Sequence, residues 1–419
     1  MSNKPTSCLD PFETDAISVA EAKQTIFDKI TPIKSSVKVA LRDALNQYLA
    51  EDLVSDINVP PHTNAAMDGY AIAGSDLPTE NTKTYQVAGS SFAGIPSDES
   101  YQQGKVTRIM TGAVMPNGTD SVIPQEVVDV LEDGSIQIDA SQRTGQNVRH
   151  PGEDIPKGAV VFKKSHKVSA ADLGILASLG KGEIKILRRP RVAFFSTGDE
   201  LKSIGETLNE GDIYDSNRYT LFALLKNLDV EIIDLGVIKD TKEGIEQAFI
   251  EAAELADIVI TSGGVSVGEA DFIKPTLKKL GDTHFWKIAM KPGRPLTFGS
   301  YNNSWFFGLP GNPVAVMVTF MQFVQPAINY LASGSIQSSL SLKAISQQAI
   351  KKRPGRTEYI RAIMQQTEDG ELEVKLTGKQ GSGILMSMSL ANCFIHLPTE
   401  SAGVEAGASV EIVPFKSLL

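Results

Sequence analysis

The stretch that decides the fold lies between Arg191 and Asp271 and contains three strand-like segments: RVAFFSTGDEL (191–201), EIIDLGVIKD (231–240) and ADIVITSGGVSVGEAD (256–271). Each segment begins as an apolar run and ends in glycine or acidic residues, and helix-like sequence follows it. A strand, an acidic loop and a helix repeated three times predict a doubly wound α/β domain. An open sheet of this kind binds its ligand beyond the carboxyl ends of its strands.

A carboxylate follows each of the three predicted strands: Glu200, Asp240 and Asp271. We expect these side chains to meet at one edge of the sheet. Mg²⁺ is usually held by one or two carboxylates together with substrate phosphates and water, so the pattern favours phosphate chemistry. Asp240 and Asp271 are therefore the candidate metal ligands, and Glu200 is either a ligand or a base. The alternative is that Asp215, Asp240 or Thr241 only caps the helix that follows it.

A basic turn, HFWKIAMKPGRP (284–295), carries Lys287, Lys291 and Arg294. Lys287 and Lys291 are four residues apart, so alternation along a strand predicts that both point towards the edge where the acids lie. There they would offset the charge of an anionic ligand. The alternative is a solvated turn between two edge strands.

Two prolines, Pro310 and Pro313, bracket Gly311 and Asn312 directly before a long apolar helix. This arrangement turns backbone N–H groups and the positive end of a helix towards a ligand. A tight turn between strand and helix is an equally good reading. The apolar stretch itself, Val314 to Ala332, contains Gln322 and Gln325 and reads as a buried core helix and not a membrane span.

The composition favours an enzyme of a reducing, cytoplasmic compartment. Forty Lys and Arg against fifty Asp and Glu give a formal net charge of −10, which argues against nucleic acid or an anionic membrane as the main partner. Cys8 and Cys393 belong to no CxxC or His/Cys cluster, so neither a disulfide framework nor a structural zinc site is supported. The N-terminus lacks the apolar segment of a signal peptide.

Changes in the sequence pattern predict a multidomain α/β protein. Residues 1–53 and 155–190 form a helical domain, into which a turn-rich and β-rich domain, 54–154, is inserted. The α/β domain covers 191–335. A small β-barrel domain, 336–419, completes the chain. Helix starts are expected at Ser18, which forms a capping box with Glu21, and at Ser169, and a further helical segment is expected around Leu41 to Leu49.

Taken together, the motifs of this chain resemble those of the molybdopterin molybdenumtransferases, the MoeA proteins related to the E domain of gephyrin. The resemblance covers almost the whole chain, and it rests on the following motifs in this order: NAAMDGYA, RIMTGA, RHPGED, FSTGDEL, YDSNR, TSGGVSVGEAD, FWKIAMKPGRP, GLPGNPV and QGSG. It implies Mg²⁺-dependent insertion of molybdate into adenylylated molybdopterin with release of AMP. It also implies a four-domain subunit working as a homodimer, in which the inserted domain of one subunit completes the cleft of the other.

The resemblance also assigns roles to individual residues. It implies catalytic roles for Glu200, Lys287, Lys291, Asp68 and Thr111, of which the last two otherwise read as turn residues. It implies metal binding by Asp240 and Asp271. Substrate or cofactor binding is implied for Asp154, Gly263, Gly264, Pro310, Pro313, Arg356 and Ser382. The sequence departs from the family pattern at Ala65, Arg294, Ala315 and His62, and of these Arg294 and Ala315 bear on substrate positioning.

Two other functions share part of this pattern. A molybdopterin adenylyltransferase has loops of the STGDE and SGGVS type, but the motifs NAAMDGY and RIMTGA argue against it here. A non-catalytic scaffold, as in gephyrin relatives that bind receptor segments, would not need the set Asp240, Asp271 and Lys291. The expected partners are a second copy of the chain, adenylylated molybdopterin, the upstream adenylyltransferase and downstream proteins of molybdoenzyme maturation.

Overall fold

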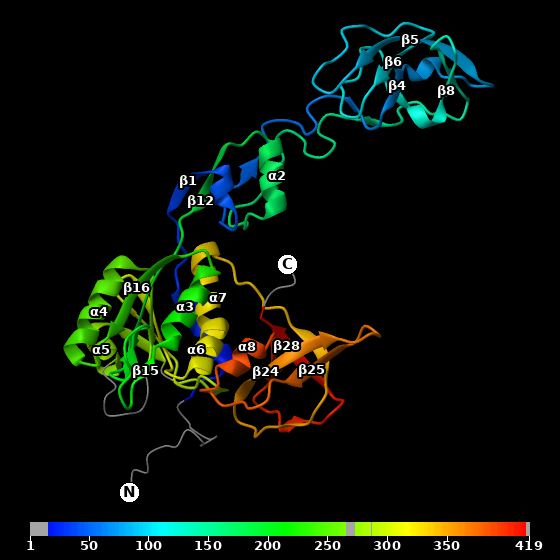
Figure 1. The fold of residues 1–419 in the computed structure, drawn as a ribbon. Coiled ribbons are helices and arrows are strands. Elements are labelled where there is room, and N and C mark those ends of the chain that lie inside the picture. The colour runs from blue at the N-terminus through cyan, green and yellow to red at the C-terminus, as the bar shows by residue number, and fades with distance from the viewer. Residues whose placement is uncertain (1–15, 265–272, 286, 416–419) are drawn as a thin grey trace. The chain divides into compact units, whose positions relative to one another are not determined.

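The computed structural model describes residues 16–264, 273–285 and 287–415. The chain divides into two compact units. Unit 1 comprises Met1–Val37, Asn46–Tyr48 and Leu187–Leu419, and unit 2 comprises Lys38–Leu45 and Leu49–Ile186. Figure 1 labels the elements of both.

Unit 1 is built on a six-stranded sheet with the strand order β16-β13-β17-β21-β20-β18. The strands are β16 (Glu231–Ile238), β13 (Arg191–Thr197), β17 (Ile258–Ser262), β21 (Ser304–Leu309), β20 (Thr297–Tyr301) and β18 (Asp282–Phe285). The first four are parallel, and β20 and β18 continue the sheet in antiparallel fashion. The three strands predicted from the sequence are therefore neighbours, and their carboxyl ends share one edge of the sheet.

Helices cover both faces of this sheet. On one face lie α4 (Lys242–Leu255) and α5 (Ile273–Leu280); on the other lie α1 (Val19–Lys29), α3 (Ser216–Lys226), α6 (Pro313–Thr319) and α7 (Gln325–Ser333) (Figure 1). Side chains alternate across a strand, so Phe194 packs in the core with α3 while its neighbour Phe195 packs against α4. Both phenylalanines are fully buried, which confirms the predicted doubly wound domain.

The apolar helix after β21 extends from Pro313 to Ser333 and includes a π-helical turn, η4 (Phe320–Val324). Among the described residues it is the one helix long and apolar enough to cross a membrane, with a mean hydropathy of 1.3. However, 67% of its most apolar window is buried inside the protein. This burial agrees with the prediction of a core helix.

The C-terminal part of unit 1 is a closed β-barrel, as predicted. Its five strands pair in the order β24-β25-β22-β28-β26, and β26 pairs again with β24. They are β24 (Thr357–Gln366), β25 (Leu372–Leu376), β22 (Leu342–Ser346), β28 (Ser409–Pro414) and β26 (Cys393–Leu397). The short strand β19 (Met290–Lys291) adds to β24 in parallel register and ties the barrel to the chain that leaves β18. Smaller elements of unit 1 are α8 (Met386–Leu390) and the pairs β23 (Ile350–Lys351) with β27 (Gly403–Val404) and β14 (Leu201–Lys202) with β15 (Ile213–Tyr214).

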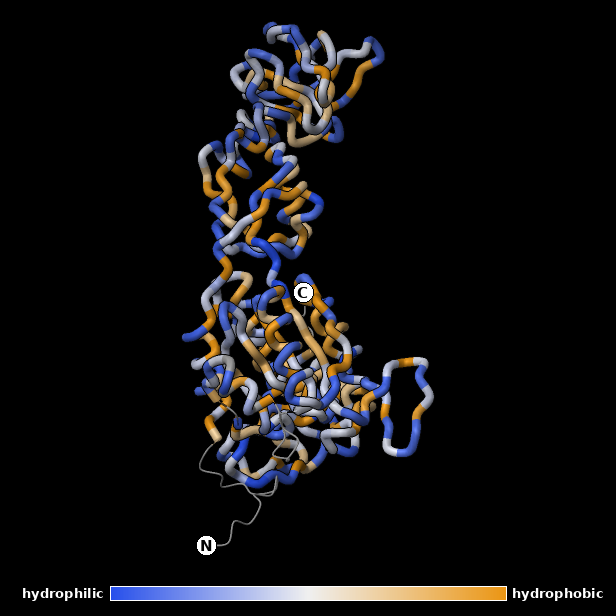
Figure 2. Tube along the Cα trace, turned by 90° about the vertical axis from the view of Figure 1, so that its left-hand side faces the viewer, coloured by the Kyte–Doolittle hydropathy of each residue, from blue (hydrophilic) through white to orange (hydrophobic). Residues whose placement is uncertain are grey.

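Unit 2 contains a second six-stranded sheet, with the order β7-β4-β6-β5-β9-β8. Its strands are β7 (Ser121–Pro124), β4 (Gly69–Ile72), β6 (Lys105–Ile109), β5 (Lys83–Ser91), β9 (Ile136–Ile138) and β8 (Asp129–Val130). Other elements are α2 (Ala170–Ser178), the 3₁₀ turns η1 (Leu41–Ala44), η2 (Gly74–Asp76) and η3 (Gln125–Val127), and three two-stranded pairs: β1 (Ser36–Ala40) with β12 (Glu183–Leu187), β2 (Leu53–Val54) with β11 (Val160–Phe162), and β3 (Asn64–Ala65) with β10 (Val148–Arg149). Figure 2 colours the chain by hydropathy and shows short hydrophobic and hydrophilic stretches following one another along the trace.

The first part of the chain is less helical than its pattern predicts. The segment expected as a helix from Leu41 to Leu49 forms only η1. The first helix, α1, has the predicted capping box, but its buried residues Ala22 and Ile26 belong to the core of unit 1. An amphipathic pattern shows that a helix has an apolar face and does not show which surface covers it. The boundaries of the four domains stay a prediction.

Candidate active site

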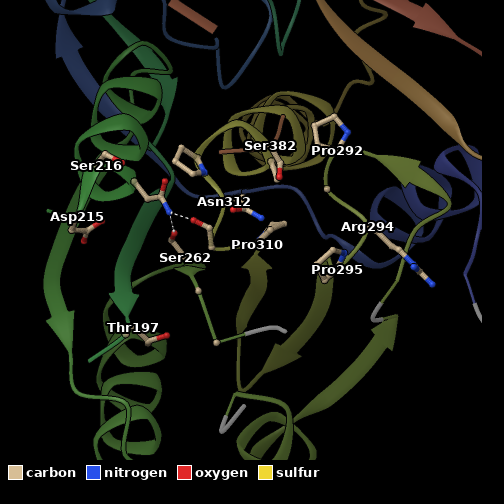
Figure 3. Close-up of a pocket in the computed structure, with 18 of the residues that line it drawn as sticks. Thr197, Asp215, Ser216, Ser262, Pro292, Arg294, Pro295, Pro310, Asn312 and Ser382 are labelled. Atoms are coloured by element: carbon tan, nitrogen blue, oxygen red, sulfur yellow. Dashed lines mark hydrogen bonds between the residues drawn. The ribbon is translucent and has the colours of Figure 1, made fainter. Parts of the chain in front are cut away.

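A cavity of about 780 Å³ opens at the carboxyl edge of the unit 1 sheet. The loops after β13, β16, β17 and β21 reach it, together with the turn that follows β19 and two turns of the barrel. Its lining contains many of the residues singled out from the sequence: Glu200, Asp240, Gly263, Gly264, Lys291, Arg294, Pro310, Pro313, Ala315, Arg356 and Ser382. Figure 3 shows Ser382 of the barrel beside Pro310 and Asn312.

One side of the cavity carries Glu200 and Asp240; we call these two residues, together with Asp199 next to them, the acidic wall. The backbone N–H of Asp240 donates to Asp199 Oδ1 over 3.4 Å, so the loops after β13 and β16 touch. Asp240 Oδ1 is buried and has no hydrogen-bond partner in the described chain. Burial raises the pKa of Asp240, and the negative charges of Asp199 and Glu200 raise it further. A cation at this wall would relieve both effects.

Hydrogen bonds distinguish Asp240 from two nearby residues that cap helices. Asp215 accepts from the N–H of Arg218 and caps α3, and Thr241 accepts from the N–H of Gly244 and caps α4. Both residues therefore cap helices, although Asp215 also lines the cavity and its Oδ2 is buried without a hydrogen-bond partner in the described chain. Asp240 is not the cap of α4, and its carboxylate serves no helix end.

The glycine pair after β17 allows the loops to approach each other closely. Gly263 and Gly264 have φ values of +93° and +65°, which favour glycine. A Cβ at Gly263 would lie 2.5 Å from the carbonyl oxygen of Thr197, and one at Gly264 would lie 2.7 Å from Ile273 Cδ1. The remainder of the predicted loop, with Glu269 and the candidate metal ligand Asp271, lies outside the described residues.

The opposite side, which we call the basic wall, contains Lys291, Arg294 and Arg356. The predicted alternation from Lys287 to Lys291 is wrong, because no continuous strand joins them. The strand β19 contains only Met290 and Lys291, and the chain folds back so that the N–H of Ile288 donates to the carbonyl of Arg294 over 2.9 Å. Within the described chain, Lys291 lines the cavity and Lys287 is not among the lining residues.

A buried arginine of the barrel, which sequence reasoning missed, holds the QGSG turn at the cavity. Arg361 is 2% exposed, and its guanidinium donates to the carbonyl of Gly381 over 2.9 Å and to Ser387 Oγ over 3.1 Å. Gln380 Oε1 accepts from the backbone N–H of Arg361 over 3.0 Å. Burial lowers the pKa of Arg361 to about 10. Arg361 thus fixes the backbone that presents Ser382.

Asn217 on α3 joins three loops of the site and was also missed. Its Nδ2 donates to Ser262 Oγ over 2.8 Å and to the carbonyl of Gly311 over 2.7 Å (Figure 3). The amide therefore connects the end of β17 to the turn between β21 and α6. The sequence contained a signal, the motif YDSNR, but nothing in its pattern indicated which residue makes the contacts.

The remaining predicted residues lie in unit 2. Asp68 Oδ1 accepts from both the backbone N–H and the hydroxyl of Thr111, each over 2.7 Å. These bonds, the backbone one first, lower the pKa of the exposed Asp68 carboxyl. Asp154 is exposed, and its N–H donates to the carbonyl of Val59 over 3.0 Å. Asp68 and Thr111, distant in sequence, thus form one side-chain pair.

Comparison with known families covers nearly the whole chain. Residues 17–180 match the MoeA N-terminal region (domain I and II), residues 193–330 match the probable molybdopterin binding domain, and residues 343–415 match the MoeA C-terminal region (domain IV). The fold is that of the multidomain α/β MoeA proteins: a molybdopterin biosynthesis MoeA protein from Pyrococcus horikoshii OT3 superimposes with a TM-score of 0.83 at 30% identity, covering 96% of this chain and 100% of that one.

Individual relatives agree with the family match. A molybdopterin molybdenumtransferase of Haemophilus influenzae is 45% identical over 404 residues, covering 96% of this chain and 100% of the relative. Proteins with the same name from Staphylococcus aureus and Nostoc are each 34% identical and cover 95% and 97% of this chain, and 95% of their own length. The chain belongs to the molybdopterin molybdenumtransferase family, and it is a transferase of molybdenum cofactor biosynthesis.

Proposed function

We propose that this enzyme inserts molybdenum from molybdate into adenylylated molybdopterin, in a reaction that needs Mg²⁺ and releases AMP. The observation that carries the proposal is the single cavity with an acidic wall and a basic wall. Such a cavity suits a divalent cation and a polyanionic substrate held together, because each wall offsets the charge of one of them. Most of the loops around it come from the family's molybdopterin binding domain, and two barrel turns come from its C-terminal region.

The acidic wall fits Mg²⁺. Asp240 offers a hard oxygen ligand, and its buried Oδ1 has no partner within the described chain. Among the described residues there is no group of three His, Cys, Asp or Glu side chains that could hold a metal. Mg²⁺ does not need such a group, since one or two carboxylates with substrate phosphates and water suffice. We propose Asp240 and Asp271 as the protein ligands, with Glu200 as a further ligand or a base.

The protein's own residues would act on the substrate from both walls. Bound Mg²⁺ would supply positive charge at the phosphate oxygens as the phosphoanhydride bond of the adenylylated substrate breaks. Lys291, Arg294 and Arg356 would hold molybdate or the phosphate and offset negative charge that grows as AMP leaves. Gly264 and the turn residues Gly311 and Asn312 would bind the substrate through backbone N–H groups, and Ser382 would bind it from the barrel.

We further propose that the enzyme works as a cytoplasmic homodimer. Every residue that lines the cavity, within the described chain, belongs to unit 1, whereas Asp68, Thr111 and Asp154 belong to unit 2. In the proposed dimer, unit 2 of one subunit supplies these residues to the cavity of its partner. A mixed dimer of an Asp68→Ala subunit and an Asp240→Ala subunit would then keep one working site, whereas each homodimeric variant would keep none.

The reaction is tested with purified protein, adenylylated molybdopterin, molybdate and Mg²⁺, with AMP release as the readout. We expect AMP release that requires both molybdate and Mg²⁺ and that stops when a chelator removes the metal. AMP release at the same rate without molybdate would contradict the proposal. Net consumption of ATP with unmodified molybdopterin would instead indicate an adenylyltransferase.

A further inference from the structure

The basic wall rests on a buried carboxylate. Glu358 on β24 is 8% exposed, and its Oε2 lies 3.5 Å from Lys291 Nζ. The two residues are register partners in the pairing of β19 with β24, so the backbone fixes their proximity. The Lys291 side chain is 54% exposed. Lys291 therefore lines the cavity and at the same time forms an ion pair with the buried carboxylate of Glu358.

A second lysine, Lys352, is buried in the same part of the barrel. It is 7% exposed, and its Nζ donates to the carbonyls of Arg353, Thr399 and Ser401 over 3.3, 3.2 and 3.0 Å. Three acceptors match the three donors of an ammonium group, so the cage suits the charged form. Burial lowers the pKa of Lys352, and the negative charge of Glu358 acts in the opposite direction.

Electrostatic interactions connect this buried lysine to the cavity. Lys352 is attracted by Glu358 and Glu400 and repelled by Arg356 and Lys291. Lys291 and Arg356 line the cavity, whereas Lys352 and Glu358 do not belong to the lining within the described residues. Neither buried charge lines the cavity, so each would act on a ligand there only electrostatically, through the lining residues Lys291 and Arg356.

We propose that Glu358 and Lys352 are positioning residues that set how strongly the basic wall binds an oxyanion: Glu358 holds Lys291 in place and weakens its attraction for the anion, and Lys352 partly compensates Glu358. The inference rests on the proposed function only for the kinetic readout, since oxyanion binding is measured without the reaction. It assigns these two residues a role in the site without contact to the substrate.

Opposite effects follow for the two charges. Replacing Glu358 by Gln removes a negative charge near the anion and should strengthen anion binding. It also releases the long Lys291 side chain, whose freedom must then be lost again in the transition state, so kcat should fall. Replacing Lys352 by Met leaves Glu358 less compensated and Lys291 more tightly paired. Anion binding should then weaken.

The first experiment titrates full-length protein with sodium molybdate, and separately with inorganic phosphate, in a calorimeter. We expect Glu358→Gln to tighten binding by about threefold to tenfold and Lys352→Met to weaken it by a similar factor. Glu358→Asp keeps the charge and should stay near the wild-type affinity. Glu231→Gln, which breaks the ion pair with Arg191 at the opposite end of the sheet, controls for the change in net charge. Weaker binding in both Glu358→Gln and Lys352→Met would overturn the proposal, because loss of barrel structure alone gives that result.

The second experiment asks whether Glu358 acts through Lys291. Glu358→Gln should lower kcat by about tenfold while KM for molybdate falls, a combination that general destabilisation does not produce. In a Lys291→Met background the same substitution should leave kcat unchanged, since the group that it positions is gone. An equal loss of kcat in both backgrounds would overturn the proposal. If the wild-type enzyme released no AMP, the proposed function would fail, while the calorimetric result would still decide the inference.

Discussion

The two walls of the cavity differ in how their charges are compensated. On the basic wall, Lys291 is paired with the buried carboxylate of Glu358, and the buried Lys352 of the barrel is held by a cage of three carbonyls. On the acidic wall, Asp240 has a buried oxygen without a partner in the described chain and repelling neighbours in Asp199 and Glu200. The basic wall thus carries its own counter-charge, whereas the acidic wall needs a cation from outside. Mutations on the two walls should therefore have different consequences.

The largest effect is expected at the acidic wall. Asp240→Asn keeps the shape of the side chain but removes the charge that would hold Mg²⁺, so AMP release should fall by on the order of a hundredfold or more. Stability should not fall, because the substitution removes a half-buried negative charge that its neighbours repel. Kinetics and thermal unfolding without metal measure both quantities. A melting temperature reduced as strongly as activity would show that Asp240 has a structural role.

The next effect is expected at the basic wall. Lys291→Ala removes charge stabilisation that grows as AMP leaves, worth about 3 kcal/mol by analogy with one oxyanion donor. The value of kcat should fall far more than the affinity for molybdate. The Lys291→Ala substitution also leaves Glu358 buried without its partner lysine, so the free energy of unfolding should fall as well. Unchanged turnover in Lys291→Ala would show that this lysine is only a solvated turn residue.

A third substitution tests the loop between the walls. Gly263→Ala places a Cβ 2.5 Å from the carbonyl oxygen of Thr197 at a φ of +93°, so we expect a loss of about 1–3 kcal/mol in the free energy of unfolding and reduced AMP release. Gly311→Ala is the matched control, since the nearest atom to its Cβ is Gly263 Cα at 3.8 Å. Chemical denaturation compares the two, and equal losses would refute the close-approach argument.

The smallest effect is expected beside Asp240. Thr241→Ala removes the side-chain cap of α4 and should cost about 1 kcal/mol of unfolding free energy. AMP release should stay within about twofold, because the lost bond belongs to a helix end. The two neighbouring substitutions, Thr241→Ala and Asp240→Asn, would then distinguish helix capping from metal binding. A strong loss of activity in Thr241→Ala would show that α4 itself must stay fixed for Asp240 to function.

The sequence predicted the parts of this site that depend on strand order. Apolar runs ending in acids identified three adjacent strands, and parallel pairing then brings Glu200 and Asp240 to one edge. It did not predict that Asp215 caps a helix while Asp240 does not, because both patterns look alike until hydrogen bonds are known. The strand argument for Lys287 was wrong because the chain folds back at Ile288.

Residues that support the site without lining the cavity left no signal in the sequence. Glu358, Lys352 and Arg361 lie on or near one barrel strand, and their roles come from burial and from partners distant along the chain. A charged residue in an alternating strand is normally read as facing solvent. Arg361 is buried because it bonds the QGSG turn and α8, and Lys352 is buried because loop carbonyls surround it, contacts that strand alternation does not reveal.

The most direct test of the account is a crystal structure of the enzyme with adenylylated molybdopterin, Mn²⁺ in place of Mg²⁺, and molybdate, with anomalous scattering used to locate both metals. The account predicts Mn²⁺ at the acidic wall, with Asp240 coordinating it directly or through water, and molybdenum at the basic wall within reach of Lys291. Mn²⁺ bound away from Asp240, or both metals on one wall, would contradict it.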